Sequence, residues 1–102
     1  MSFGKNFLTT VGASATTSGV AIVKTGLPTV GKASLVLYPT RSGAVRLQYS
    51  SGALANGKYL LIPAAAGGDD PLVIDFDSVS DLPTHIAGDV GTVSVTYTVA
   101  VK

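Results

Sequence analysis

The sequence lacks cysteine, tryptophan and glutamate, and it holds only one methionine and one glutamine. Without cysteine, neither a disulfide framework nor a cysteine-bound metal can stabilise the chain. Glutamate, glutamine and methionine are strong helix formers, so their scarcity argues against long helices. Charged residues make up 13% of the 102 residues, about half the roughly 25% of an ordinary soluble domain. So few charges leave much of the surface to small and apolar residues, which favours assembly with other subunits.

Long apolar runs are also missing. The longest, YLLIPAAA at 59–66, is far shorter than the roughly 20 residues that a membrane-spanning helix needs. The first ten residues, MSFGKNFLTT, contain no apolar core of signal-peptide length. We therefore expect a protein that is made and used without export and that does not associate with membranes.

Valine and threonine dominate instead, with 13 and 11 copies. Their branched side chains are stiff and favour the pleated, half-buried surface of a sheet. Turn residues divide the chain into candidate strands at 7–12, 19–25, 33–39, 44–50, 58–63, 72–77 and 92–101. The sequence therefore predicts an all-β fold, an antiparallel β-sandwich or jelly roll of about seven strands. We expect a single domain over residues 1–102, with 1–6 as a flexible N-terminal arm.

The segment 92–101 has the clearest pattern. Its odd-numbered residues are apolar and most of its even-numbered residues carry hydroxyls. This period of two predicts one buried and one exposed face. The predicted core residues are Val93, Val95, Tyr97, Val99 and Val101. The same alternation in 44–50 places Arg46 and Gln48 on an exposed face.

Residues 26–34, GLPTVGKAS, nearly match the phosphate-binding pattern G-x-x-x-x-G-K-[ST]. Ala33 stands where that pattern needs a hydroxyl to hold magnesium. A phosphate-binding loop also leads directly into a helix, whereas Lys32 is followed by a β-branched and aromatic run that ends in proline. The apolar segment LVIDFD at 72–77 is an ordinary strand by the same reasoning. We interpret 26–34 as a turn between two strands.

The charges are divided along the chain. Six of the seven bases precede the first acid, Asp69, and all six acids then follow before Lys102. Either the two halves pair within one folded subunit, or they form a basic and an acidic patch that suit head-to-tail packing of identical copies. The candidate assembly contacts are Lys24, Lys32, Arg41, Arg46 and Lys58 on the basic side, and Asp69, Asp70, Asp75 and Asp77 on the acidic side.

Catalytic and metal-binding chemistry has less support in the sequence. The aspartates lack the roughly 12-residue spacing of a calcium loop, and neither a metal nor a cofactor is expected. His85 is the single histidine. Pro83 stops the one short helical turn expected within 77–86, so Ser78, Asp81 and His85 cannot line one helix face as a triad. We expect no enzymatic activity, and we expect His85 to lie on a loop.

Two kinds of binding module remain as alternatives. Tyr38, Tyr49 and Tyr59 lie near basic residues in the sequence, a combination that binds single-stranded nucleic acid when it is exposed on a sheet. A carbohydrate-binding β-sandwich would need exposed aromatic rings. These tyrosines share strand faces with leucine and valine, so we expect most of them in the core.

In overall character the chain resembles small structural proteins of phage virions, such as capsid decoration or cement proteins. These often begin at an unexported Met, lack cysteine and form β-sandwiches rich in Val, Thr, Ala and Gly, with loops such as AAAGGDDP (64–71). The likeness covers the whole chain in composition and texture. It implies a β-rich oligomeric subunit of a virion, made in the host cytoplasm, that binds copies of itself, a capsid shell protein, or both. Nucleic acid and membrane are not expected partners.

Overall fold

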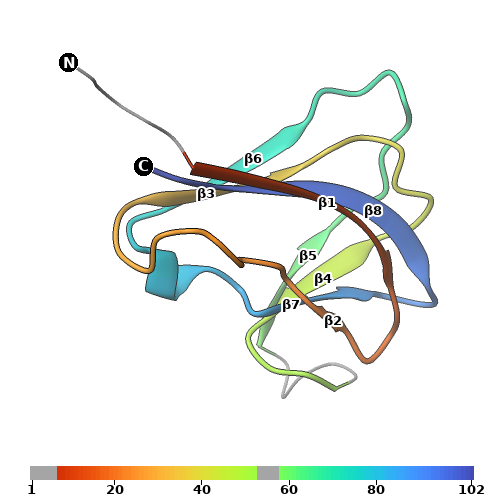
Figure 1. The fold of residues 1–102 in the computed structure, drawn as a ribbon. Helices are drawn as coiled ribbons and strands as arrows, with labels where there is room; N and C mark the ends of the chain where they lie inside the picture. Colours follow the sequence, from red (N-terminus) through yellow and green to blue (C-terminus); the bar gives the residue numbers. More distant parts are fainter. Residues whose placement is uncertain (1–6, 53–57) are drawn as a thin grey trace.

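A computed structural model describes residues 7–52 and 58–102, so the predicted arm at 1–6 lies outside the described residues. The described chain forms two antiparallel four-stranded sheets that pack as a β-sandwich (Figure 1). The strands are β1 (Phe7–Ala15), β2 (Val20–Ala21), β3 (Ala33–Leu37), β4 (Val45–Gln48), β5 (Tyr59–Ile62), β6 (Leu72–Phe76), β7 (His85–Gly88) and β8 (Val93–Val101). The predicted all-β antiparallel sandwich is thereby confirmed.

The strand order is nested. Sheet A has the order β1-β8-β3-β6 and sheet B the order β2-β7-β4-β5. The first strand therefore pairs with the last, the second with the seventh, the third with the sixth, and the fourth with the fifth. Each pair switches sheet relative to the next, so the loops cross repeatedly from one sheet to the other.

One strand was missed by the sequence analysis. The prediction that His85 lies on a loop is wrong, because His85 begins β7, which pairs with both β2 and β4 in sheet B. The four residues HIAG contain one β-branched residue and a glycine, so their local β preference is weak. Pairing on both sides fixes this strand, and pairing partners distant in the sequence leave no local signal.

Other boundaries differ in length. The strand predicted at 19–25 is only the two residues of β2, and the strand predicted at 7–12 continues to Ala15. The short helical turn predicted within 77–86 is confirmed as a 3₁₀ turn at Val79–Asp81. The Ser78 hydroxyl caps it by accepting a hydrogen bond from the Ser80 amide.

The core lies between the sheets, and β8 supplies its central row. All five predicted core residues of this strand are buried. Leu35 and Leu37 of β3 and Val45 and Leu47 of β4 also lie in the core cluster. The Tyr97 hydroxyl accepts a hydrogen bond from the Val23 amide at 2.9 Å. This bond ties the chain after β2 to the sandwich interior.

Replacing Tyr97 with alanine should lower the free energy of unfolding by about 3–5 kcal/mol, because the buried ring leaves a cavity. Tyr97→Phe keeps the ring and loses only the bond to Val23, so we expect a loss of about 1 kcal/mol. Ser94→Ala, on the opposite face of β8, should stay within about 0.5 kcal/mol of the wild type. Urea unfolding followed by circular dichroism measures all three. Equal effects of the alanine variants at 94 and 97 would show that the faces are wrongly assigned.

Candidate functional site

Arg46 in β4 points away from the core and is nevertheless buried, with 1% of its surface exposed. The predicted exposure of Arg46 and Gln48 is therefore wrong. Loops cover this part of the outer face of sheet B. The guanidinium Nη2 donates to the Thr17 carbonyl at 2.8 Å, and Nη1 donates to the carbonyl and the carboxylate of Asp89 at 2.9 and 3.1 Å. The side chain thus joins the β1–β2 loop to the β7–β8 loop.

Gln48 continues this network. Its Oε1 accepts a hydrogen bond from Arg46 Nε at 2.9 Å, and its Nε2 donates to the carbonyls of Ser50 and Gly52. The Tyr59 ring lies over the guanidinium, with 5.7 Å between Arg46 Cζ and the ring centroid. Every buried side-chain N or O atom of the described residues has a hydrogen-bond partner. The network is fully satisfied, as a structural role requires.

Arg41 is also buried, and it holds a different loop by hydrogen bonds. Its guanidinium donates to the Pro63 carbonyl from Nε and Nη2, and to the Tyr38 carbonyl from Nη1. These bonds hold the segment around Thr40, whose φ of 72° is in the left-handed region. A β-branched residue adopts this conformation only when its surroundings impose it. Arg41 therefore holds a strained link between β3 and β4.

The remaining candidate contacts lie in four places. Lys32, Asp75 and Asp77 come together, with Ser34 and Lys102, around a pocket of about 260 Å³ at the end of the β3–β6 pair. Here the Ser34 hydroxyl donates to Asp75 Oδ1 at 2.6 Å. Lys32 from the basic half and the C-terminal Lys102 thus lie near acids of the acidic half without a close ion pair. In the described part of the chain, Arg46–Asp89 at 3.1 Å is the one ion pair.

Asp69 and Asp70 are exposed on the loop between β5 and β6. Asp69 Oδ2 accepts a hydrogen bond from the Ala66 amide at 2.8 Å, and this bond closes the loop locally. Lys24 follows β2 and is half-buried, and Lys58 is exposed just before β5. The nine candidate residues are spread over the fold and do not form one basic patch beside one acidic patch. Their role as assembly contacts stays a prediction, with Arg41 and Arg46 already bonded inside the subunit.

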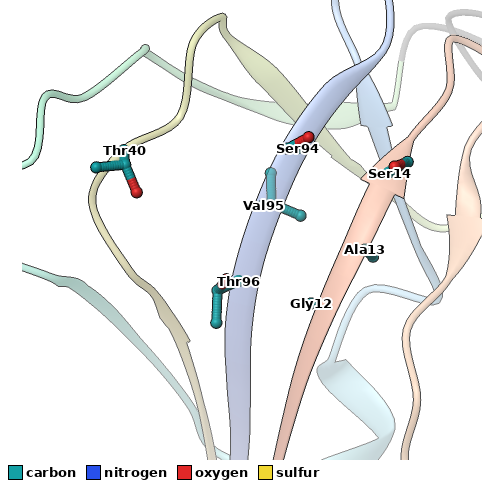
Figure 2. Close-up of a pocket in the computed structure, with 7 residues that line it drawn as sticks. All are labelled: Gly12, Ala13, Ser14, Thr40, Ser94, Val95 and Thr96. Atoms are coloured by element: carbon teal, nitrogen blue, oxygen red, sulfur yellow. The ribbon is translucent and has the colours of Figure 1, made fainter.

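The outer face of sheet A is almost free of charge. The strand pairing places in it Leu8, Thr10, Gly12, Ser14, Ser34, Val36, Val73, Asp75, Ser94, Thr96, Thr98 and Ala100. Asp75 is the only charged member. A shallow pocket of about 360 Å³ lies on this face between β1, β8 and Thr40 (Figure 2). Serine and threonine hydroxyls line it, and it contains no nucleophile–base pair.

The predicted burial of the tyrosines at 38, 49 and 59 is wrong. Tyr49 is 45% exposed, and Tyr38 and Tyr59 are partly exposed. Partial burial, with a smaller contribution from the Asp81 carboxylate, raises the pKa of Tyr49 above its usual 10.0. The Tyr49 hydroxyl donates to the Asp81 carbonyl at 2.9 Å. Sheet edges and loops leave these rings half covered, which strand alternation alone does not reveal.

The segment 26–34 forms the loop before β3 and the start of that strand, as the sequence analysis predicted. Gly31 has a φ of 127°, and a Cβ there would lie 2.5 Å from the Lys102 carbonyl oxygen. Close packing against the end of β8 therefore explains this glycine. Within residues 7–52 and 58–102, no group of three or more acidic or histidine side chains is placed to hold a metal ion. No helix in that same part of the chain is long and apolar enough to cross a membrane.

No protein-family model, curated protein or solved structure matches the chain.

Arg46→Ala should lower the free energy of unfolding by about 3–5 kcal/mol, because it leaves Asp89, Gln48 and the Thr17 carbonyl without their shared donor. Asp89→Asn should cost only about 1 kcal/mol, since the side chain is 34% exposed and the Asp89 carbonyl still binds Arg46. Thermal and urea unfolding test both variants. An Arg46→Ala protein as stable as the wild type would contradict the anchoring role.

Proposed function

We propose that the protein is a non-enzymatic structural subunit of a phage capsid, either a decoration (cement) protein or a minor capsid subunit. The strand order carries this proposal. From eight strands nested in pairs across two four-stranded sheets we infer a jelly roll, an architecture used by viral capsid proteins. The same architecture serves lectins and cupins, so the fold alone does not choose among these functions.

Among these functions, the surface of the protein favours assembly into a capsid. Two strands at one side of the sandwich, β5 and β6, carry the exposed apolar residues Leu60, Leu61, Leu72 and Val73. The outer face of sheet A has only Asp75 as a charge. Monomeric proteins seldom leave such surface without a partner. A subunit that packs against a shell or against its own copies would cover it.

A carbohydrate-binding module is the second candidate, because jelly rolls include lectins and Tyr49 offers an exposed ring. Sugar binding by stacking would depend on this ring. Tyr49→Ala should then abolish binding to a glycan, whereas it should leave capsid association unchanged. Nucleic-acid binding has less support, because two of the cations that would bind phosphate, Arg41 and Arg46, are hydrogen-bonded within the subunit.

The proposal implies that a phage encodes the chain, and the test uses the particles of that phage. We expect density-gradient-purified particles to contain the protein at a fixed copy number, measured by quantitative mass spectrometry. Particles grown without the gene should fail to assemble or should lose their contents at a lower temperature. Absence of the protein from purified particles would refute the proposal.

Charged residues should determine the rate and the register of assembly more than the affinity between assembled subunits. Asp69→Asn combined with Asp70→Asn should slow assembly at low salt several-fold, and the difference should vanish at high salt. An asparagine at 69 still offers an oxygen to the Ala66 amide, so the loop should keep its shape. Light scattering during assembly measures the rates. Asp81→Asn, which removes an exposed charge elsewhere, is the control, and an equal slowing by it would argue against a specific contact.

A further inference from the structure

A β-sandwich has four edge strands, and three of those here carry features that block pairing with another chain. β2 contains two residues. β5 contains four, between Lys58 and Pro63. β6 follows Pro71 and contains Asp75. Short length, charge and proline are the usual means by which proteins protect a sheet edge.

The fourth edge, β1, has none of these features. Its nine residues, FLTTVGASA, contain no charge and no proline. Among the strands of residues 7–52 and 58–102, it pairs with β8 alone, on one side. Leu8, Thr10, Gly12 and Ser14 are exposed, Leu8 by 63%.

The backbone bonds show which groups of β1 point outward. In the β3–β8 pair, the Lys102 amide bonds to the Lys32 carbonyl and the Tyr38 amide to the Thr96 carbonyl. Even-numbered residues of β8 thus face β3, so its odd-numbered residues face β1. Odd residues of β1 lie opposite odd residues of β8. The amides and carbonyls of Leu8, Thr10, Gly12 and Ser14 therefore point away from the sheet, and no backbone bond within the described chain uses them.

We propose that two copies of this chain pair through β1, antiparallel across a two-fold axis that passes at Val11. This inference rests on the proposed function and specifies how the subunit associates with itself. With Val11 opposite its counterpart, Thr10 of one copy faces Gly12 of the other, and Leu8 faces Ser14. All nine residues then overlap, and each outward-pointing amide meets a carbonyl.

The side chains fit this register. Val11 and Ala13, on the inner face of β1, pack against the core but are only partly buried. A second β1 would cover them. On the outer face, a Cβ at Gly12 would meet nothing within 4 Å in the subunit, so the surface that faces Thr10 of the partner is open and also accepts an alanine. No charge lies in either row of β1, so the strand itself presents no like charges to an identical copy.

This pairing joins two sheets of order β1-β8-β3-β6 into one continuous eight-stranded sheet. The contact is isologous, so it closes at two copies and does not propagate into a fibre. In this register an identical copy gives every outward-pointing amide and carbonyl of β1 a partner, and it adds no charge to the uncharged edge. The proposed partner is therefore another copy of this chain.

Gly12→Pro tests the pairing directly. Proline removes an amide that points off the edge, so it breaks no hydrogen bond within the subunit and is tolerated there. Gly12→Ala adds a similar Cβ and keeps the amide. By size-exclusion chromatography with light scattering, we expect the wild type and Gly12→Ala to have twice the 10.3 kDa of one chain. Gly12→Pro should shift to the single-chain mass, with an unchanged circular dichroism spectrum.

Cysteine cross-linking tests the register even if Gly12→Pro folds poorly. The chain has no cysteine, so one substitution introduces a unique thiol. Val11→Cys places two thiols opposite each other at the axis, whereas Ala13→Cys places each opposite Thr9 of the partner. Mild oxidation should convert most of the Val11→Cys protein, and little of the Ala13→Cys protein, into a disulfide-linked dimer. Equal cross-linking of both would overturn the register.

The outcomes separate the two proposals. A wild type that stays monomeric at millimolar concentration overturns the β1 pairing, and detection of the protein in particles would still support the capsid role. An oligomer that Gly12→Pro leaves intact also overturns β1 pairing and points to another surface. A β1 dimer that is absent from particles would uphold the pairing and refute the capsid role.

Discussion

β1 and β8 pair over nine residues, from Phe7 opposite Val101 to Ala15 opposite Val93. This contact joins the two ends of the described chain, so every other strand pair must form inside the loop that it closes. The nested pairs β2–β7, β3–β6 and β4–β5 all lie within this loop. Contacts between residues so far apart in sequence are costly in loop entropy and slow to form. β8 pairs with both β1 and β3 and has a fully buried inner row, whereas β1 pairs with β8 alone among the described strands.

The loops depend on a second kind of interaction. Nested pairing sends the chain from sheet to sheet, and each crossing leaves backbone carbonyls that need partners. Arg46, Gln48 and Arg41 supply donors to these carbonyls. A guanidinium suits this task because its planar fork offers five donors in a fixed geometry. Two of the chain's few cations thus serve loop closure.

The strongly periodic parts of the fold could be predicted from sequence. Segment 92–101 alternates at every position except Ala100, and its inner face is buried as predicted. The burial of Arg46 and Gln48 could not be predicted, because alternation identifies a face but not the loops that cover it. β7 was missed since its stability comes from β2 and β4 rather than from its own residues. At the candidate site, the sequence identified the charged residues, yet only folding reveals that Lys32, Asp75 and Asp77 share one pocket and that Arg46 is enclosed.

The unpaired edge of sheet A and the charged residues of this sheet lie at its two opposite edges. In the order β1-β8-β3-β6, the uncharged edge is β1, and Asp75 lies on β6 at the other end. Two copies joined through β1 would therefore carry β6 at both outer edges of the combined sheet. Asp75, Asp77 and Lys32 would remain exposed there, away from the dimer contact. In the proposed dimer, apolar and backbone contacts would hold the two copies together, and the charged ends would set the register against a shell or a neighbouring dimer.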